Sequence, residues 1–125
     1  MTTQARRIGL IGMVLCAHLA LSGCGLAPRT FRALKQPEGI KRARAATLAD
    51  RLPDARAIPP LIGRLDDPDP VVRMAAHEEL KKRTGKNFGY EPWLEDAAER
   101  APARDKWRAW WQSRESSLSK SSQIR

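Results

Sequence analysis

Residues 57–84 have the sequence AIPPLIGRLDDPDPVVRMAAHEELKKRT, and this stretch predicts two helices folded back on each other around a turn. Three apolar residues at helical spacing precede the turn: Leu61, Ile62 and Leu65. The turn itself is the acidic segment 66–70. Asp69 followed by Pro70 signals a helix start, because the aspartate oxygen can accept a bond from a free N–H and proline fits the first helical position. A lone helical hairpin cannot bury its apolar face, so another part of the chain must pack on it.

The segment after the turn shows the apolar face of an amphipathic helix: Val72, Ala75, Ala76 and Leu80. Small side chains such as the paired alanines let two helices approach closely. We expect three charged residues to face away from this surface: Glu78, Lys81 and Lys82. The pairs Glu78–Lys82 and Glu79–Arg83 have the spacing of surface ion pairs, which contribute about 0.3–0.5 kcal/mol each. Gly85 suits the left-handed position that ends a helix.

A weaker copy of this pattern precedes the hairpin. With a shift of thirty-two residues, segment 40–43 aligns with segment 72–75, and Leu48 aligns with Leu80. A weak period of this length indicates a helical solenoid. We therefore predict a helix over 41–52.

The order of these parts resembles a HEAT repeat, a pair of helices that stacks into a solenoid. That family has a proline early in the first helix, here Pro59 and Pro60, and a D-x-x-x-x-V-R pattern leading into the second. The residues that match the pattern are Asp67, Val72 and Arg73. The resemblance covers 40–85 and implies one full repeat plus half of another, with aspartate and arginine in a polar ladder between repeats. Because residues before proline avoid the helical region, Pro59 is the expected helix start, although the family allows a start one turn earlier.

The N-terminal segment has the pattern of an export signal. Residues 1–7 carry two arginines and no acid, and residues 8–21 are mostly apolar. This run is too short for a membrane span, which needs roughly 20 residues, and it fits the apolar core of a secretory signal peptide. The following Leu21-Ser22-Gly23-Cys24 resembles the lipobox of bacterial lipoproteins.

The lipobox resemblance implies that signal peptidase II cleaves after Gly23 and that Cys24 carries the lipid. Residues 1–23 would then be the signal peptide, and the mature chain would keep a net charge of +7. Several acyl chains on one residue give stable anchoring to a membrane. Gly25 stands where an acidic residue retains some lipoproteins in an inner membrane, so the resemblance favours the periplasmic face of an outer membrane. An ordinary signal peptide cut near Ala27 and an uncleaved anchor are the alternatives.

Residues 24–38 are expected to form a lipidated N-terminus and a basic linker, because they contain two prolines and little periodicity. Between Arg29 and Arg44, six cations stand against one acid, Glu38. Next to a lipid anchor these cations could contact anionic headgroups, each contributing about 1 kcal/mol near the surface. A solvated spacer is the alternative. Nucleic acid is not an expected partner of an exported protein, whatever its charge.

The C-terminal part concentrates the aromatic residues, with six of the seven between Phe88 and Trp111. Gly89 is the expected pivot of a loop there, and three tryptophans lie at helical spacing: Trp107, Trp110 and Trp111. The expected elements are a loop over 86–92, a short helix from Pro92 or Trp93 to Arg100, and a last helix from Pro102 to Gln112.

The tryptophan helix is best interpreted as a closing element. An array of so few repeats needs its open end covered, and each large aromatic side chain buries some 150–250 Å². The alternative is an aromatic platform for a glycan or a peptide, with Arg104 or Arg108 as its polar partner. The serine-rich segment 113–125 is expected to be disordered.

No arrangement of residues for catalysis is present in the sequence. His77 is the one histidine after residue 23 and is expected to be a partly exposed surface residue. The acids of the turn lack the order and the glycine of a calcium loop, so we interpret them as turn and cap residues: Asp66, Asp67 and Asp69. We expect no enzymatic activity, no metal, no cofactor and no small-molecule substrate.

These predictions describe an all-α protein, a short HEAT-like solenoid over 39–112 with an aromatic C-terminal capping helix. We expect an exported lipoprotein, anchored to a bacterial membrane through Cys24, whose HEAT-like module binds or scaffolds another envelope protein. The alternative function is cell-wall or glycan binding through the C-terminal aromatic segment.

Overall fold

The structure is a computed structural model that describes residues 30–123. Within that range all regular elements are helices, as predicted. The predicted signal peptide over 1–23 and the lipid-bearing Cys24 lie outside the described residues. No helix between residues 30 and 123 is long and apolar enough to cross a membrane. The elements in chain order, with η marking a 3-10 helix, are η2 (Phe31–Lys35), α2 (Gly39–Ala46), η3 (Thr47–Arg51), α3 (Asp54–Arg64), α4 (Pro70–Thr84) and α5 (Ala97–Gln123).

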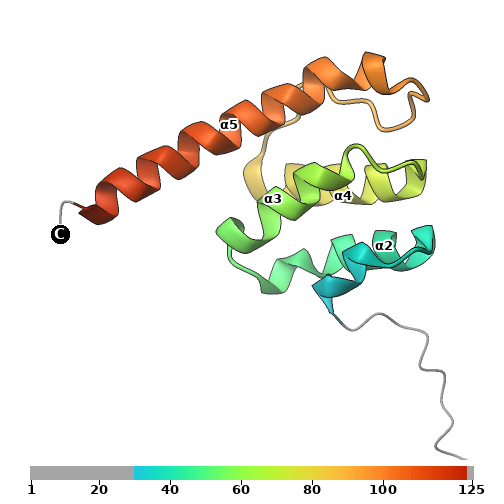
Figure 1. Cartoon of the computed structure of the whole chain (residues 1–125), viewed down its shortest axis with the longest axis horizontal. Helices are drawn as coiled ribbons and strands as arrows, with labels where there is room; N and C mark the ends of the chain where they lie inside the picture. The colour runs from blue at the N-terminus through green and yellow to red at the C-terminus, as the bar shows by residue number, and fades with distance from the viewer. Residues whose placement is uncertain (1–29, 124–125) are drawn as a thin grey trace, which may run out of the picture.

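Helices α3 and α4 form the predicted hairpin, and α4 has the predicted ends (Figure 1). Asp69 caps the N-terminus of α4, because its Oδ1 accepts the backbone N–H of Val71 at 2.9 Å. Pro70 takes the first helical position, where its missing N–H costs nothing. Gly85 follows the last turn with a φ of 69°, the left-handed conformation that favours glycine.

Helix α3 begins at Asp54, one turn before the expected start at Pro59. Pro59 and Pro60 lie inside the helix, where each removes one backbone hydrogen bond. The additional turn places Ala57 and Ile58 in the core, where both are fully buried. Complete burial of an isoleucine side chain contributes about 1.5–3 kcal/mol, which offsets the unfavourable helical conformation before a proline.

The helix predicted over 41–52 is present as two pieces, α2 and the 3-10 helix η3. Helix α2 packs against α4, and Figure 1 shows the two side by side. Three alanines of these pieces are fully buried: Ala45, Ala46 and Ala49. Their small side chains allow the close helix approach that we predicted from the alanines of α4.

The folded domain begins before residue 39, where we predicted its boundary. The 3-10 helix η2 occupies part of the expected linker, and its residues Ala33 and Leu34 are buried in the core. These two apolar side chains order the segment against α2, in spite of the prolines and charges around it. The linker prediction is therefore wrong over 31–35.

The C-terminal part forms one long helix, α5, in place of the two short helices that we predicted. Residues 92–93 form a turn, residues 94–96 have no regular structure, and α5 begins at Ala97. Pro102 does not interrupt the helix. Its ring and Ala98 are both exposed, so water can satisfy the carbonyl of Ala98 that loses its helical partner.

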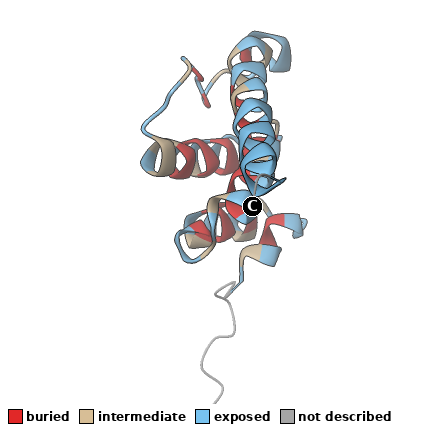
Figure 2. Cartoon of the chain, turned by 90° about the vertical axis from the view of Figure 1, so that its left-hand side faces the viewer, coloured by how far each residue is buried: buried red, intermediate tan, exposed pale blue. Residues whose placement is uncertain are grey.

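Helix α5 continues to Gln123, through the segment from Ser113 that we predicted to be disordered. Residues 112–123 are exposed (Figure 2), and this end of the helix projects beyond the other helices (Figure 1). Several serine hydroxyls there donate to carbonyls three or four residues earlier, as Ser116 does to Gln112 at 2.8 Å. Local hydrogen bonds of this kind satisfy the polar side chains within the helix.

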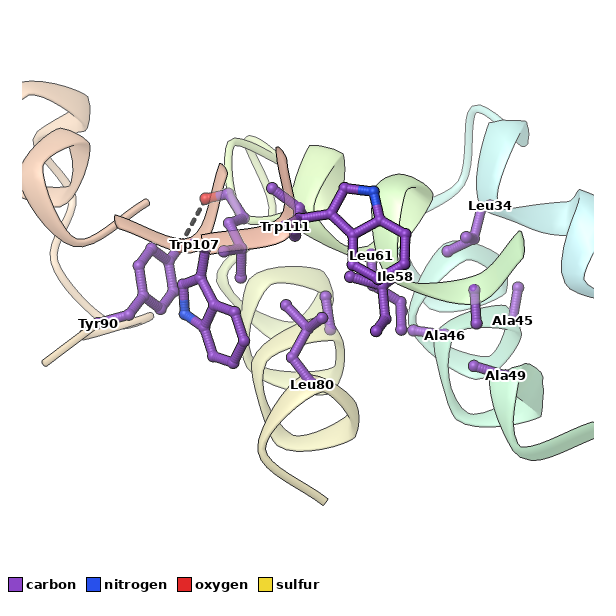
Figure 3. Packing of buried hydrophobic residues seen from close by; sticks show 14 of the residues in the cluster. Leu34, Ala45, Ala46, Ala49, Ile58, Leu61, Leu80, Tyr90, Trp107 and Trp111 are labelled. Atoms are coloured by element: carbon purple, nitrogen blue, oxygen red, sulfur yellow. Dashed lines mark hydrogen bonds between the residues drawn. The ribbon is translucent and has the colours of Figure 1, made fainter. Parts of the chain in front are cut away.

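One apolar core connects the elements (Figure 3). Its centre consists of large side chains from α3, from the residue that follows α3 and from α4: Ile58, Leu61, Leu65 and Leu80. Tyr90 and Trp107 lie at one end of the core in Figure 3, and Leu34 with the alanines of α2 and η3 lies at the other.

Candidate binding site

Three arginines occupy the same position in three helices. Arg42, Arg73 and Arg100 are each the fourth residue of their helix, α2, α4 and α5. All three are buried, with exposed fractions of 8%, 1% and 4%. Each guanidinium group points back along the chain and donates hydrogen bonds to the backbone carbonyls five and six residues earlier. An acidic residue stands four positions before each arginine: Glu38, Asp69 and Asp96.

The first two arginines also bind the turn of the following repeat. Arg42 donates from Nε and Nη2 to the two carboxylate oxygens of Asp67, both at 2.8 Å. Arg73 donates from Nε to the carbonyl of Pro92 at 2.9 Å and from Nη2 to that of Leu94 at 3.2 Å. These contacts form a polar ladder between repeats, as the HEAT resemblance implied.

The third arginine has no such neighbour. Arg100 keeps the two backward contacts, but its buried Nε has no partner among the described residues. Sequence reasoning missed Arg42 and Arg100 as ladder residues, because the thirty-two-residue shift aligned Arg42 with Met74 instead of Arg73. An acid four positions before an arginine is the signal that identifies all three. The same helix start therefore occurs three times, at α2, α4 and α5, whereas we predicted one full repeat and half of another.

His77 is buried, not partly exposed as we predicted, with 3% of its surface accessible. Its ring meets Tyr90 edge-on at a centroid distance of 5.1 Å and Trp107 at 6.3 Å. Burial, followed by the nearby charge of Lys81, lowers the pKa of His77 below its ordinary value. The imidazole is therefore neutral at neutral pH and acts as a packing residue of the aromatic end of the core.

Glu79 and Arg83 form a buried pair, which corrects the prediction of a surface pair. Glu79 is 6% exposed and accepts a bond from Arg83 Nε at 3.2 Å. Burial, together with the neighbouring carboxylate of Asp50, raises the pKa of Glu79. Arg83 also donates to Asp54 at 2.8 Å and to the carbonyl of Leu52 at 3.0 Å. The pair thus ties the end of α4 to the start of α3.

The second predicted surface pair, Glu78–Lys82, does not form. Glu78 pairs with Lys81 at 2.7 Å, one position nearer in the chain. Lys82 pairs with Asp50 of η3 at 2.5 Å. These contacts lie at the surface and contribute little to stability.

The acidic turn has a structural role, as predicted. Asp67 is buried and is held by Arg42 and, at 3.1 Å, by Arg64. Asp69 caps α4, and its backbone N–H donates to Asp67 Oδ1 at 3.0 Å. Between residues 30 and 123 no group of three or more His, Cys, Asp or Glu side chains is placed to hold a metal ion.

The tryptophan helix closes the stack, as predicted. Trp107 is fully buried and Trp111 is 6% exposed. Arg104 and Arg108, which we considered as polar partners for a ligand, bind Asp66 at 2.6 and 3.0 Å. These bonds attach α5 to the turn between α3 and α4, so both arginines have a structural role here.

A groove of about 770 Å³ lies between η2 and α3, with η3 beneath it. Its floor is apolar: Phe31, Leu34, Leu48, Leu52 and Pro60. Its rim carries five cations: Arg32, Lys35, Arg51, Arg56 and Arg64. No acidic residue lines it. Arg64 binds Asp67, whereas the other four cations pair with no carboxylate within the part of the chain that the structure describes.

The groove exists because the first repeat lacks a full first helix. In the second repeat this helix is α3, with 11 residues, whereas its counterpart η2 has five. The groove side of α3 presents residues at the spacing of one helical face: Arg56, Pro60, Gly63 and Arg64. A Cβ added to Gly63 would meet no atom within 4 Å. This face of α3 is therefore uncovered where another helix of the array would pack.

Stacked helix pairs joined by a ladder of buried arginines define a helical-repeat scaffold. The family model for HEAT repeats matches residues 27–111, about two thirds of the chain. The protein belongs to the HEAT-repeat family. No curated protein and no solved structure gives a significant match. The matched range includes η2 and the closing tryptophans, in agreement with the early start of the folded domain. Members of this family typically mediate protein–protein interaction and provide a non-catalytic scaffold.

Proposed function

We propose that the protein is an exported lipoprotein, anchored to a bacterial membrane through Cys24, whose HEAT domain binds a partner protein at the cell envelope. The observation that carries the binding function is the uncovered groove between η2 and α3, with its apolar floor and cationic rim. The anchor is supported by the sequence alone, by the apolar run 8–21 followed by Leu-Ser-Gly-Cys.

The anchor and the groove lie close together in the chain. Thr30, at the edge of the groove, is separated from Cys24 by five residues. An extended chain spans at most about 3.6 Å per residue, so this segment reaches roughly 20 Å. A lipid on Cys24 would therefore hold the groove near the headgroups, within reach of other proteins of the envelope. The absence of an acid after Cys24 favours the periplasmic face of an outer membrane where the cell has two membranes.

Metabolic labelling tests the anchor. Cells that express the full chain are grown with an alkyne fatty acid, and the wild type is compared with Cys24→Ala. We expect label on the wild type and none on the variant, together with loss of the variant from the membrane fraction. Cys16→Ala is the matched control and keeps its label, because Cys16 lies within the predicted signal peptide. Equal labelling of the wild type and Cys24→Ala would refute the anchor.

Cell-wall or glycan binding is the second candidate function, and it rests on Trp93. This side chain is 60% exposed, the only aromatic residue between 30 and 123 with such a large accessible surface. Exposed tryptophan rings are suited to stacking on sugars or other flat groups. Sedimentation with purified wall material, lost in Trp93→Ala, would support this function. A defined cross-linked protein in intact cells, unaffected by Trp93→Ala, would support the first.

A further inference from the structure

The uncovered face of α3 has the dimensions of a helix site. In a helical-repeat array, each helix packs between the corresponding helices of the neighbouring repeats. Helix α3 has 11 residues and is about 16 Å long. On the side that faces the first repeat, its counterpart is η2, which has only five residues. Gly63 adds space on this face, because a backbone can approach a glycine closely. A helix of three or four turns would complete the array here.

The floor of the groove requires an apolar stripe on whatever occupies it. Phe31, Leu48 and Leu52 are half-buried, and Leu34 below them is buried. They come from three elements, η2, η3 and the segment before α3, so they form one surface along the groove. An amphipathic helix with apolar residues at i, i+3, i+4 and i+7 covers such a surface.

The rim requires acidic groups on both sides of that stripe. Arg32 and Lys35 come from η2, Arg51 from η3 and Arg56 from α3, so the cations are spread over all three elements that line the groove. Neither end of the chain provides this charge. Residues 24–29 contain Arg29 and no acid, and the exposed segment 113–123 of α5 contains two cations and one acid. These two end segments, from this chain or from a second copy, are therefore a poor electrostatic match for the rim.

We infer that the groove binds an amphipathic helix with acidic flanks, provided by the partner protein; this inference rests on the proposed protein-binding function. The apolar stripe fills the floor in place of the missing first helix of the array. The acidic flanks face the cations of the rim and set the orientation and the specificity of the helix. Binding weakens as salt concentration rises, because the cations of the rim are exposed.

Two synthetic peptides test the inference on the full chain in phosphatidylcholine nanodiscs. Both have about 14 residues with leucine at i, i+3, i+4 and i+7, and the other positions hold glutamate in one peptide and lysine in the other. Fluorescence anisotropy measures binding. We expect the glutamate peptide to bind at least roughly tenfold more tightly than the lysine peptide. Equal binding of the two peptides, or no binding of either, would overturn the inference.

Three variants locate the peptide. The double variant Arg51→Glu/Arg56→Glu is expected to bind the glutamate peptide at least roughly tenfold more weakly than the wild type does. Lys106→Glu/Lys120→Glu makes the same change in net charge on the exposed surface of α5 and is expected to bind like the wild type. Gly63→Trp fills the groove without a change of charge and is expected to abolish binding. Circular dichroism confirms that each variant is folded, and unchanged binding in the first and third variants would contradict the groove as the site.

Other occupants of the groove would give different results. Displacement of the peptide by short-chain phosphatidylglycerol, but not by short-chain phosphatidylcholine, would identify a lipid site and overturn the inference. A concentration-dependent dimer that Gly63→Trp abolishes would identify a second copy and would also overturn it.

A photoreactive residue in living cells separates this inference from the proposed function. Placed at Lys35, on the rim of the groove, it is expected to cross-link an envelope protein. Placed at Lys106, on α5, it is expected to give no such product. A protein cross-linked from Lys106 alone would preserve the proposed binding function and overturn the groove inference. Equal fatty-acid labelling of the wild type and Cys24→Ala would refute the anchor and leave the groove unaffected.

Discussion

Arg42 of α2 and Asp67 of the turn between α3 and α4 form a bidentate pair, with both N–O distances at 2.8 Å. The side chain of Asp67 is fully buried and that of Arg42 is 10% exposed. Burial raises the pKa of Asp67, but the bonds from Arg42 and from the Asp69 N–H more than compensate, so the pKa lies below its ordinary value. The pair therefore stays ionised at physiological pH and joins the first repeat to the second.

Asp67→Ala is expected to destabilise the protein by about 3–5 kcal/mol, because it leaves the buried guanidinium group of Arg42 without a counter-charge. Urea unfolding followed by circular dichroism measures this difference in the free energy of unfolding. Glu78→Ala is the matched control. It removes an exposed carboxylate that pairs with Lys81, and its expected cost is about 0–1 kcal/mol. An Asp67→Ala protein as stable as the Glu78→Ala protein would show that the ladder does not hold the repeats together.

The features that sequence reasoning predicted correctly have local causes. The Asp69 cap, the first-turn Pro70 and the left-handed Gly85 each depend on one or two neighbouring residues, so their sequence signals were sufficient. The closing role of the tryptophan helix followed from the large apolar surface of its side chains. The predicted hairpin contributes α3, but not α4, to the lining of the groove.

The features that were missed depend on contacts between distant parts of the chain. Nothing near His77 in the sequence indicates that Tyr90 and Trp107 surround its ring. The same holds for η2, which orders because Leu34 reaches the core. The groove could not be predicted, because it results from the difference in length between η2 and α3. Of its cations, only Arg32 and Lys35 stood out in the sequence, as part of the predicted basic linker.

Trp107→Ala is expected to cost about 3–5 kcal/mol, because it leaves a large cavity at the aromatic end of the core. Trp93→Ala removes an exposed ring and is expected to change the free energy of unfolding by no more than about 0.5 kcal/mol. Thermal unfolding compares the two variants. Fluorescence provides a second check, since native emission is expected to shift to the blue when Trp93 is replaced. An unstable Trp93→Ala protein together with a stable Trp107→Ala protein would reverse the assigned roles.

His77 is expected to make stability fall as the pH decreases below its ordinary pKa of 6.5. Its folded pKa lies below that value, so between the two values the unfolded chain binds more protons than the folded chain. The contribution of the neutral imidazole is therefore complete above 6.5 and is lost as the pH falls through the folded pKa. Glu79 acts in the opposite direction at lower pH, because its raised pKa favours protonation in the folded state.

His77→Gln tests this pH dependence. The free energy of unfolding is measured for the wild type and the variant at about pH 7.5 and about pH 5.5, on either side of the ordinary histidine pKa. We expect the wild type to lose more stability between these conditions than the variant, whatever the stability of the variant at neutral pH. Glu79 contributes equally to both proteins. Identical losses of stability in the two proteins would mean that protonation of His77 does not destabilise the folded state.

Substitution by alanine is expected to raise the stability of the protein at Gly63 and to lower it at Gly39. Gly63 lies inside α3, and an added Cβ would enter open space. Gly63→Ala is therefore expected to stabilise the protein by roughly 0.5–1 kcal/mol, because alanine loses less conformational freedom in a helix. Gly39 opens α2, and an added Cβ there would overlap the carboxylate of Asp69. Gly39→Ala must displace the cap of α4, whose loss costs about 1 kcal/mol. Urea midpoints above the wild type for Gly63→Ala and below it for Gly39→Ala would confirm the contact between α2 and the start of α4, whereas a stabilised Gly39→Ala protein would contradict it.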